Sequence, residues 1–117
     1  MLESLQVRGI IINSADTVMI MTGSDLSWGQ WIHSPVNVND KSSSTFACQD
    51  RAASPSGTEG WATWKIGDAK IKITFDASYR GSNSQSITCS PKGAYKVTCS
   101  DRAGSLNKCT FRVMPAE

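Results

Sequence analysis

The sequence has 117 residues, 39% hydrophobic and 19% charged, which is typical of a globular protein and not of a disordered chain. Its formal net charge of +2 indicates no strong field toward nucleic acid or an anionic surface, so we expect no nucleic-acid partner. The longest apolar run, Ile10 to Ile12, is far too short to span a bilayer. We predict one domain over residues 1–117.

The first residues, Met1 to Gln6, contain Glu3 but no Lys or Arg, and no long apolar stretch follows them. This pattern lacks the charged and apolar regions of a cleaved secretory signal. We therefore expect a protein that is cytoplasmic when made. Any membrane binding is then peripheral, or follows a conformational change or assembly with a partner.

Alternation of apolar and polar residues is the recurrent local pattern, and it predicts strands. In chain order we expect strands over residues 5–12, 17–22, 60–66, 69–76, 95–99 and 109–113. Turn-forming residues separate them at 13–16, 67–68, 91–93 and 102–104. No window has a sustained helical period. The fold class is therefore all-β, and we predict a single-domain antiparallel β-sandwich.

The clearest alternation brackets Gly67-Asp68, which predicts a hairpin. Its apolar faces predict core positions at Trp64, Ile66, Ile71, Ile73 and Phe75. Two stretches, 34–44 and 50–60, are irregular and rich in turn formers. They are either binding loops or solvated crossovers.

The four cysteines lack the paired spacing of a zinc site, and we expect no metal site. They are either reduced thiols or form disulfides after release from the cell. Cys99 and Cys109 lie symmetrically about Gly104, so a hairpin there would bring them opposite one another. The pairing of Cys48 and Cys89 stays equally open.

The sequence gives little support for a catalytic site. His33, the one histidine, follows Trp31 and precedes Ser34-Pro35, which is no nucleophile-elbow context. The carboxylates are scattered singly, and no glycine-rich phosphate loop precedes a helix. We expect neither an enzyme nor a cofactor, and no catalytic residue is assigned.

The tryptophans form two pairs three residues apart, Trp28 with Trp31 and Trp61 with Trp64. On an extended strand this offset puts the two members on opposite faces, so one of each pair is exposed. Exposed indoles favour interfaces and the lipid headgroup zone. Tyr79-Arg80 adds an aromatic and a cation in a probable loop, which either binds a phosphate-bearing headgroup or is merely solvated.

An ordered series of motifs resembles the aegerolysin family over residues 7–83. The motifs are Ile10-Ile11-Ile12-Asn13, Trp28-Gly29-Gln30-Trp31, Phe46-Ala47-Cys48, Gly57-Thr58-Glu59-Gly60, Phe75-Asp76 and Gly81-Ser82-Asn83. The stretch Ser34-Pro35 with Asn37-Val38 and Asn39-Asp40 is similar to the small component of bacterial binary insecticidal toxins in that family.

The resemblance implies a β-sandwich without a cofactor that binds membrane lipids such as sphingolipids, at the surface of target membranes. It also implies a larger pore-forming partner protein and release or secretion by a non-classical route. Lipid-binding members carry an acidic residue before the Gly-Thr-x-Gly stretch, and Glu59 is the candidate to replace it here. The lipid-binding candidates are thus Trp28, Trp31, Tyr79, Arg80 and Glu59. The alternative is a glycan- or protein-binding β-sandwich that uses the same aromatics.

Overall fold

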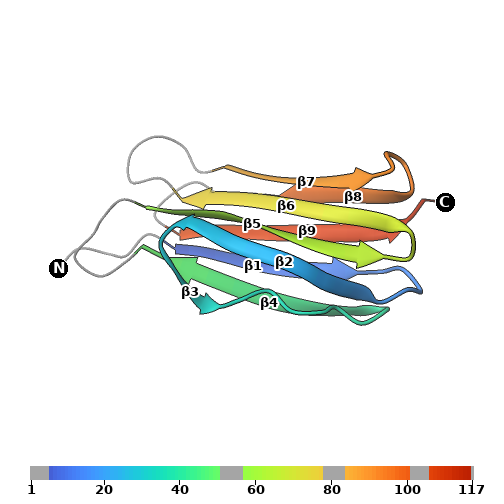
Figure 1. Cartoon of the computed structure of the whole chain (residues 1–117), viewed down its shortest axis with the longest axis horizontal. Helices are drawn as coiled ribbons and strands as arrows, with labels where there is room; N and C mark the ends of the chain where they lie inside the picture. Colours follow the sequence, from blue (N-terminus) through green and yellow to red (C-terminus); the bar gives the residue numbers. More distant parts are fainter. Residues whose placement is uncertain (1–5, 51–56, 78–83, 101–105, 117) are drawn as a thin grey trace.

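The described part of the chain forms nine β-strands in two sheets that pack face to face (Figure 1). The computed structural model describes residues 6–50, 57–77, 84–100 and 106–116, and within these ranges it contains no helix. The strands are β1 (Gln6–Asn13), β2 (Met19–Trp28), β3 (Gln30–His33), β4 (Ser42–Gln49), β5 (Thr58–Ile66), β6 (Ala69–Ala77), β7 (Ser84–Ser90), β8 (Tyr95–Ser100) and β9 (Leu106–Pro115). The expected all-β sandwich is confirmed.

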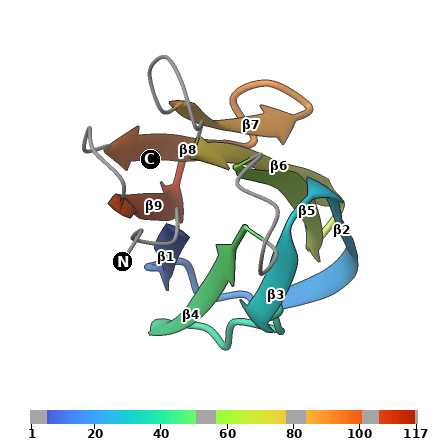
Figure 2. The ribbon, with the colours of Figure 1, turned by 90° about the vertical axis from the view of Figure 1, so that its left-hand side faces the viewer.

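One sheet has five strands in the order β3-β4-β1-β9-β8, and the other has four in the order β2-β5-β6-β7. Figure 2 looks along the strands and shows the two layers, with the edge strands β7 and β8 side by side. All pairings among the described strands are antiparallel except that of β1 with β9, which is parallel. Local alternation of apolar and polar residues does not predict the pairing of β1 with β9, because these strands lie near opposite ends of the chain.

The core lies between the inward faces of the two sheets. The five predicted core residues, Trp64, Ile66, Ile71, Ile73 and Phe75, are all at most 2% exposed, so this prediction is confirmed. They lie on β5 and β6, which the predicted Gly67-Asp68 turn joins with Ile66 opposite Ala69.

Aromatic rings connect the two layers of the core. The ring of Phe75 in the four-stranded sheet lies 4.9 Å from that of Phe46 in the five-stranded sheet, measured between centroids. Phe46 in turn lies 6.2 Å from Phe111 of β9. These contacts place large apolar groups at the sheet interface, where burial contributes most to stability.

The sequence reasoning missed three strands: β3, which has only four residues, and the serine-rich strands β4 and β7. β4 begins with three serines and β7 contains three more, and serine has no strong strand preference. β2 is also longer than expected, since it continues past Gly23 through two register shifts. Tertiary pairing, not local propensity, makes these segments extended.

The expected irregular stretch 34–44 is structured over residues 36–38 and 42–44. Residues 42–44 belong to β4, and Val38 forms a two-way backbone bridge with Met19 of β2 at 2.8 and 2.9 Å. Asn37 accepts a hydrogen bond from the Met21 backbone N–H at 2.7 Å, and the Trp64 indole N–H donates to the Val36 carbonyl at 2.9 Å. The stretch therefore covers the free edge of β2 instead of forming an open loop.

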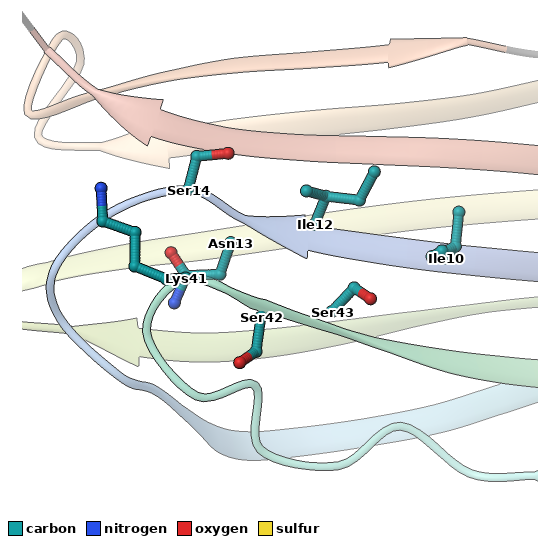
Figure 3. Close-up of a pocket in the computed structure, with 7 residues that line it drawn as sticks. All are labelled: Ile10, Ile12, Asn13, Ser14, Lys41, Ser42 and Ser43. Atoms are coloured by element: carbon teal, nitrogen blue, oxygen red, sulfur yellow. The ribbon is translucent and has the colours of Figure 1, made fainter.

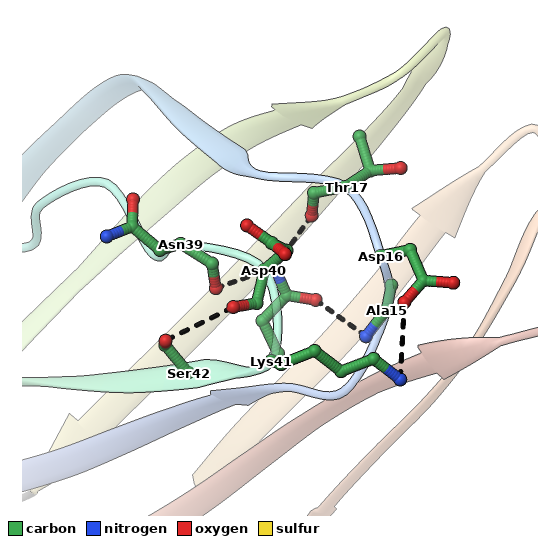
Figure 4. Close-up of polar contacts among 8 residues, drawn as sticks. Ala15, Asp16, Thr17, Asn39, Asp40, Lys41 and Ser42 are labelled. Atoms are coloured by element: carbon green, nitrogen blue, oxygen red, sulfur yellow. Dashed lines mark hydrogen bonds and ion pairs between the residues drawn. The ribbon is translucent and has the colours of Figure 1, made fainter.

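Asn13 is fully buried and links the connection between β1 and β2 to the segment 36–39, which covers the edge of β2. Its side-chain amide donates to the backbone carbonyls of Thr17, Val38 and Asn39 at 2.8, 3.3 and 3.2 Å. Nearby, the Lys41 ammonium lies 3.3 Å from an Asp16 carboxylate oxygen (Figure 4). The Lys41 backbone N–H also donates to the Ala15 carbonyl at 3.1 Å. This network ties two loops together at the end of the sandwich opposite Trp28.

None of the four cysteines, all of which are described, forms a disulfide, and Cys48 and Cys109 are buried. β8 and β9 form the expected antiparallel pair, but its register sets Cys99 opposite Phe111 and not opposite Cys109. The expected pairing of Cys99 with Cys109 is thus wrong, since the partner of Cys99 lies two residues further along β9. The second predicted irregular stretch overlaps residues 51–56, which lie outside the described residues.

Candidate functional site

Three of the five candidate lipid-binding residues lie at one end of the sandwich, which we call the Trp28 end (left in Figure 1). Trp28 is the last residue of β2, and Trp31 lies in β3. Glu59 lies near the start of β5, where β5 pairs with the end of β2. Tyr79 and Arg80 lie outside the described residues.

Gly29 separates the two tryptophans and carries the chain from one sheet to the other. Its φ of +100° is a conformation that L side chains rarely adopt. Trp28 and Trp31 therefore do not alternate along one strand, as the sequence reasoning assumed. One of them is nevertheless exposed: Trp28 is 58% exposed, whereas Trp31 is half-buried with its ring 6.0 Å from that of Phe75.

Thr58 holds the Trp28 backbone in place. The Thr58 side chain is 1% exposed, and its hydroxyl donates to the Trp28 carbonyl at 3.1 Å. In the same pairing Glu59 lies directly opposite Trp28 on the neighbouring strand. An exposed indole, with a glutamate opposite it in the strand register, is thus mounted on hydrogen-bonded strands instead of a free loop.

A groove of about 320 Å³ continues from Glu59 along the outer face of the four-stranded sheet. Trp61 is half-buried there, with the Lys72 ammonium 5.9 Å from its ring centroid, while Trp64 faces the core. The expected opposite facing of this second pair is confirmed. Glu59 lies opposite Asp76 across β5 and β6, and both line the groove. The sequence reasoning missed Lys72 and Asp76 because only the register brings them beside Trp61.

A second hollow of about 410 Å³ lies near the other end (Figure 3). Ile10 and Ile12 of β1 line it together with Ser42, Ser43 and the Asn13 region. The Asn13 amide already donates to three carbonyls, so it is not free to orient a ligand. We assign no ligand to this hollow.

Groups able to catalyse reactions or bind a metal are sparse. His33 is exposed on β3, and no cluster of three metal-binding side chains occurs among the described residues. Burial raises the pKa of the Cys48 thiol to about 11, although hydrogen bonding with the Thr58 side chain and the Val7 backbone opposes this shift. That thiol is therefore not a nucleophilic thiolate at neutral pH. The described residues also include no helix long and apolar enough to cross a membrane.

Comparison with known proteins gives a family and a fold. The Aegerolysin family model matches residues 5–115. Among solved structures, the RahU protein in complex with a TRIS molecule has a TM-score of 0.83 at 18% identity, covering 94% of both chains. IP-1A from Alcaligenes faecalis has a TM-score of 0.77 at 23% identity, covering 96% of this chain and 91% of its own. The lipid binding protein Nakanori has a TM-score of 0.83 at 8% identity, covering 97% of this chain and 72% of its own. No curated protein sequence matches the chain.

Proposed function

Because the chain belongs to the aegerolysin family, we propose that it is a non-enzymatic protein that recognises membrane lipids through the Trp28 end. The observation that carries this proposal is the 58% exposure of Trp28, a large amphipathic side chain, on a strand end held by Thr58. The structural similarity to a lipid binding protein, Nakanori, supports it.

An indole placed in the headgroup region gains free energy from its apolar ring while its N–H stays hydrated. Burying about 100 Å² of apolar surface contributes roughly 2.5 kcal/mol. Such a contribution corresponds to about a 60-fold change in the dissociation constant. Since Trp28 is already exposed in the free protein, removing it changes little in the folded state.

The test is sedimentation with vesicles across lipid compositions. Trp28→Ala is expected to weaken binding by more than tenfold with an unchanged thermal midpoint. Ile20→Ala is the matched control, because Ile20 is a 48% exposed apolar residue on the same strand, about 26 Å away. Loss of binding in both variants, or wild-type protein that ignores every mixture, would contradict the proposal.

The proposed lipids are those with sphingolipid-type headgroups, and Glu59 beside Trp28 supplies a carboxylate for a cationic headgroup amine. We further propose that the protein is released from the cell, acts at target membranes, and is the binding component of a two-component pore-forming system, cytolytic or insecticidal. Vesicles loaded with dye test this point. Binding without dye release is expected, and release by the protein alone would contradict the two-component part only.

A second candidate function is glycan binding in the Trp61 groove. An aromatic ring flanked by carboxylates and hydroxyls suits stacking and hydrogen bonding to a sugar, and Glu59, Thr74, Asp76 and Ser84 supply that rim. A glycan array separates the two candidates. Glycan binding that Trp61→Ala abolishes and Trp28→Ala leaves intact would favour the second.

A further inference from the structure

The outer face of the five-stranded sheet has an unusual distribution of charge. None of the ten acidic residues of the chain lies in its five strands. Those strands contain four basic residues, all exposed and all on the outer face: Arg8, Lys96, Lys108 and Arg112. No described residue forms an ion pair with any of them, since the ion pair found in the described part of the chain is that of Lys41 with Asp16. Among the described residues, nothing pairs with the positive charge on this face.

Strand register gathers part of this charge into one row. His33 lies opposite Ala47, Ala47 opposite Arg8, and Arg8 opposite Lys108, across β3, β4, β1 and β9. We call His33, Ala47, Arg8 and Lys108 the cationic row. Neighbouring strands are about 4.8 Å apart, so Arg8 lies about 5 Å from Lys108 and about 10 Å from His33, measured between backbones.

The row borders a hollow of about 400 Å³. Its floor includes Ala47, which is only 2% exposed although it faces outward, and the half-buried Ile10. Thr45 and Thr110 both lie opposite Ile10, so two hydroxyls flank the floor two residues further along the strands, on the same face as Arg8. The Arg8 Nε donates to the Gln6 side-chain oxygen at 3.0 Å, which leaves its two terminal amino groups available.

Two like charges opposite each other on neighbouring strands repel, and no carboxylate of the described residues forms an ion pair with Arg8 or Lys108 to offset their repulsion. An anion above the row would remove it. A guanidinium binds phosphate oxygens through two parallel hydrogen bonds, an ammonium adds a point charge, and hydroxyls donate further bonds. Groups of these kinds line this hollow, and a tetrahedral anion accepts hydrogen bonds from each kind.

We propose that the cationic row, with Thr45 and Thr110, binds a phosphate group. This site lies on the opposite layer from the Trp61 groove and does not depend on the Trp28 end. The phosphate belongs either to an anionic lipid headgroup or to a small soluble phosphate ester, and the two sources share the same recognition chemistry.

The test compares vesicles of phosphatidylcholine with and without phosphatidic acid, using the double variant Arg8→Gln/Lys108→Gln. Lys65→Gln/Lys70→Gln is the matched control, because these two exposed lysines also lie opposite each other, on the outer face of the other sheet. Both variants lose two positive charges. The first is expected to weaken binding to phosphatidic acid vesicles about 30-fold, at roughly fivefold per basic residue, and the control is not.

A nuclear magnetic resonance titration with inorganic phosphate and glycerol 3-phosphate provides the second arm. Saturable shifts at the Arg8, Ala47 and Lys108 amides, lost in the first variant, support the site even if no vesicle binds, and identify a soluble ester as its source. Retained thermal midpoints show that the variants are folded. Equal losses in both variants, no response to any phosphate probe, or binding to heparin or duplex DNA alone would overturn the proposal. Retained binding of the first variant to neutral sphingolipid vesicles separates this site from the Trp28 end.

Discussion

Substituting alanine for Gly29 tests whether the Trp28 end is as rigid as its contacts indicate. A Cβ atom at Gly29 would lie 2.4 Å from the Thr58 hydroxyl oxygen and 2.6 Å from the Gln49 backbone carbonyl oxygen. Real Cβ atoms essentially never come this close to another atom. Rotation of the Thr58 side chain moves its hydroxyl but not its Cβ atom, which would lie 2.8 Å away, and the carbonyl of Gln49 moves only if the end of β4 moves.

Two costs add in Gly29→Ala. An L residue at a φ of +100° loses about 1–3 kcal/mol to backbone strain. Overpacking against the Gln49 backbone costs a further 1–3 kcal/mol or so. The sum is about 4 kcal/mol, which lowers the thermal midpoint by about 15 °C for a protein of this length.

Gly93→Ala is the matched control. Gly93 has a similar φ of +88°, but a Cβ atom there meets nothing within 4 Å. It carries the strain without the clash, and both substitutions restrict the unfolded chain equally. Thermal denaturation followed by circular dichroism is expected to show a loss for Gly29→Ala about twice that for Gly93→Ala. Equal decreases in the thermal midpoint would refute the reasoning, because the backbone around Gly29 would then shift to accommodate the Cβ atom without losing stability.

Three further predictions concern the interior. Asn13→Asp removes the amide that donates to three backbone carbonyls and places a carboxylate next to them. Urea denaturation at neutral pH is therefore expected to show a free energy of unfolding lower by about 3 kcal/mol or more. A loss below about 1 kcal/mol would mean that water replaces the amide. Phe75→Ala is expected to cost about 3–5 kcal/mol in the same assay, since its buried ring contacts both Phe46 and Trp31. The pKa of the Cys48 thiol is raised from 9.0 to about 11 in the folded protein, so on raising the pH this thiol ionises first in the unfolded chain. The free energy of unfolding is therefore expected to fall from about pH 9 upward, by up to about 2–3 kcal/mol. Cys48→Ala lacks this component, and an identical alkaline decline in that variant would contradict it.

The sequence predicted those parts of the fold that depend on local alternation. The Gly67-Asp68 hairpin and its core residues follow from a period of two over two adjacent segments, which needs no knowledge of distant partners. The parallel partnership of β1 with β9 depends on contacts between residues about a hundred positions apart, and local patterns do not report such contacts. The serine-rich strand β7 likewise takes its conformation from its pairing with β6.

The candidate site shows the same division. The exposure of one tryptophan of the pair was predicted, but for a reason that the turn at Gly29 overrides. Trp31 belongs to a different sheet from Trp28, and which of the two is exposed follows from the packing of Trp31 against Phe75. The Trp61 groove required the register of β5 with β6, which the hairpin implies but which the sequence reasoning did not apply to the outer face.

Charge illustrates most clearly why a property of the whole chain is a poor guide to a surface. The strands of the four-stranded sheet contain three basic residues, Lys65, Lys70 and Lys72, and three acidic residues, Asp25, Glu59 and Asp76. The strands of the five-stranded sheet contain four basic residues and no acidic residue. Charges on opposite faces of the sandwich are separated by more than the screening length of about 8–10 Å, so they do not cancel for a ligand that approaches one face. A net charge of +2 therefore describes neither face, and an anion meets a field set by the nearer sheet alone.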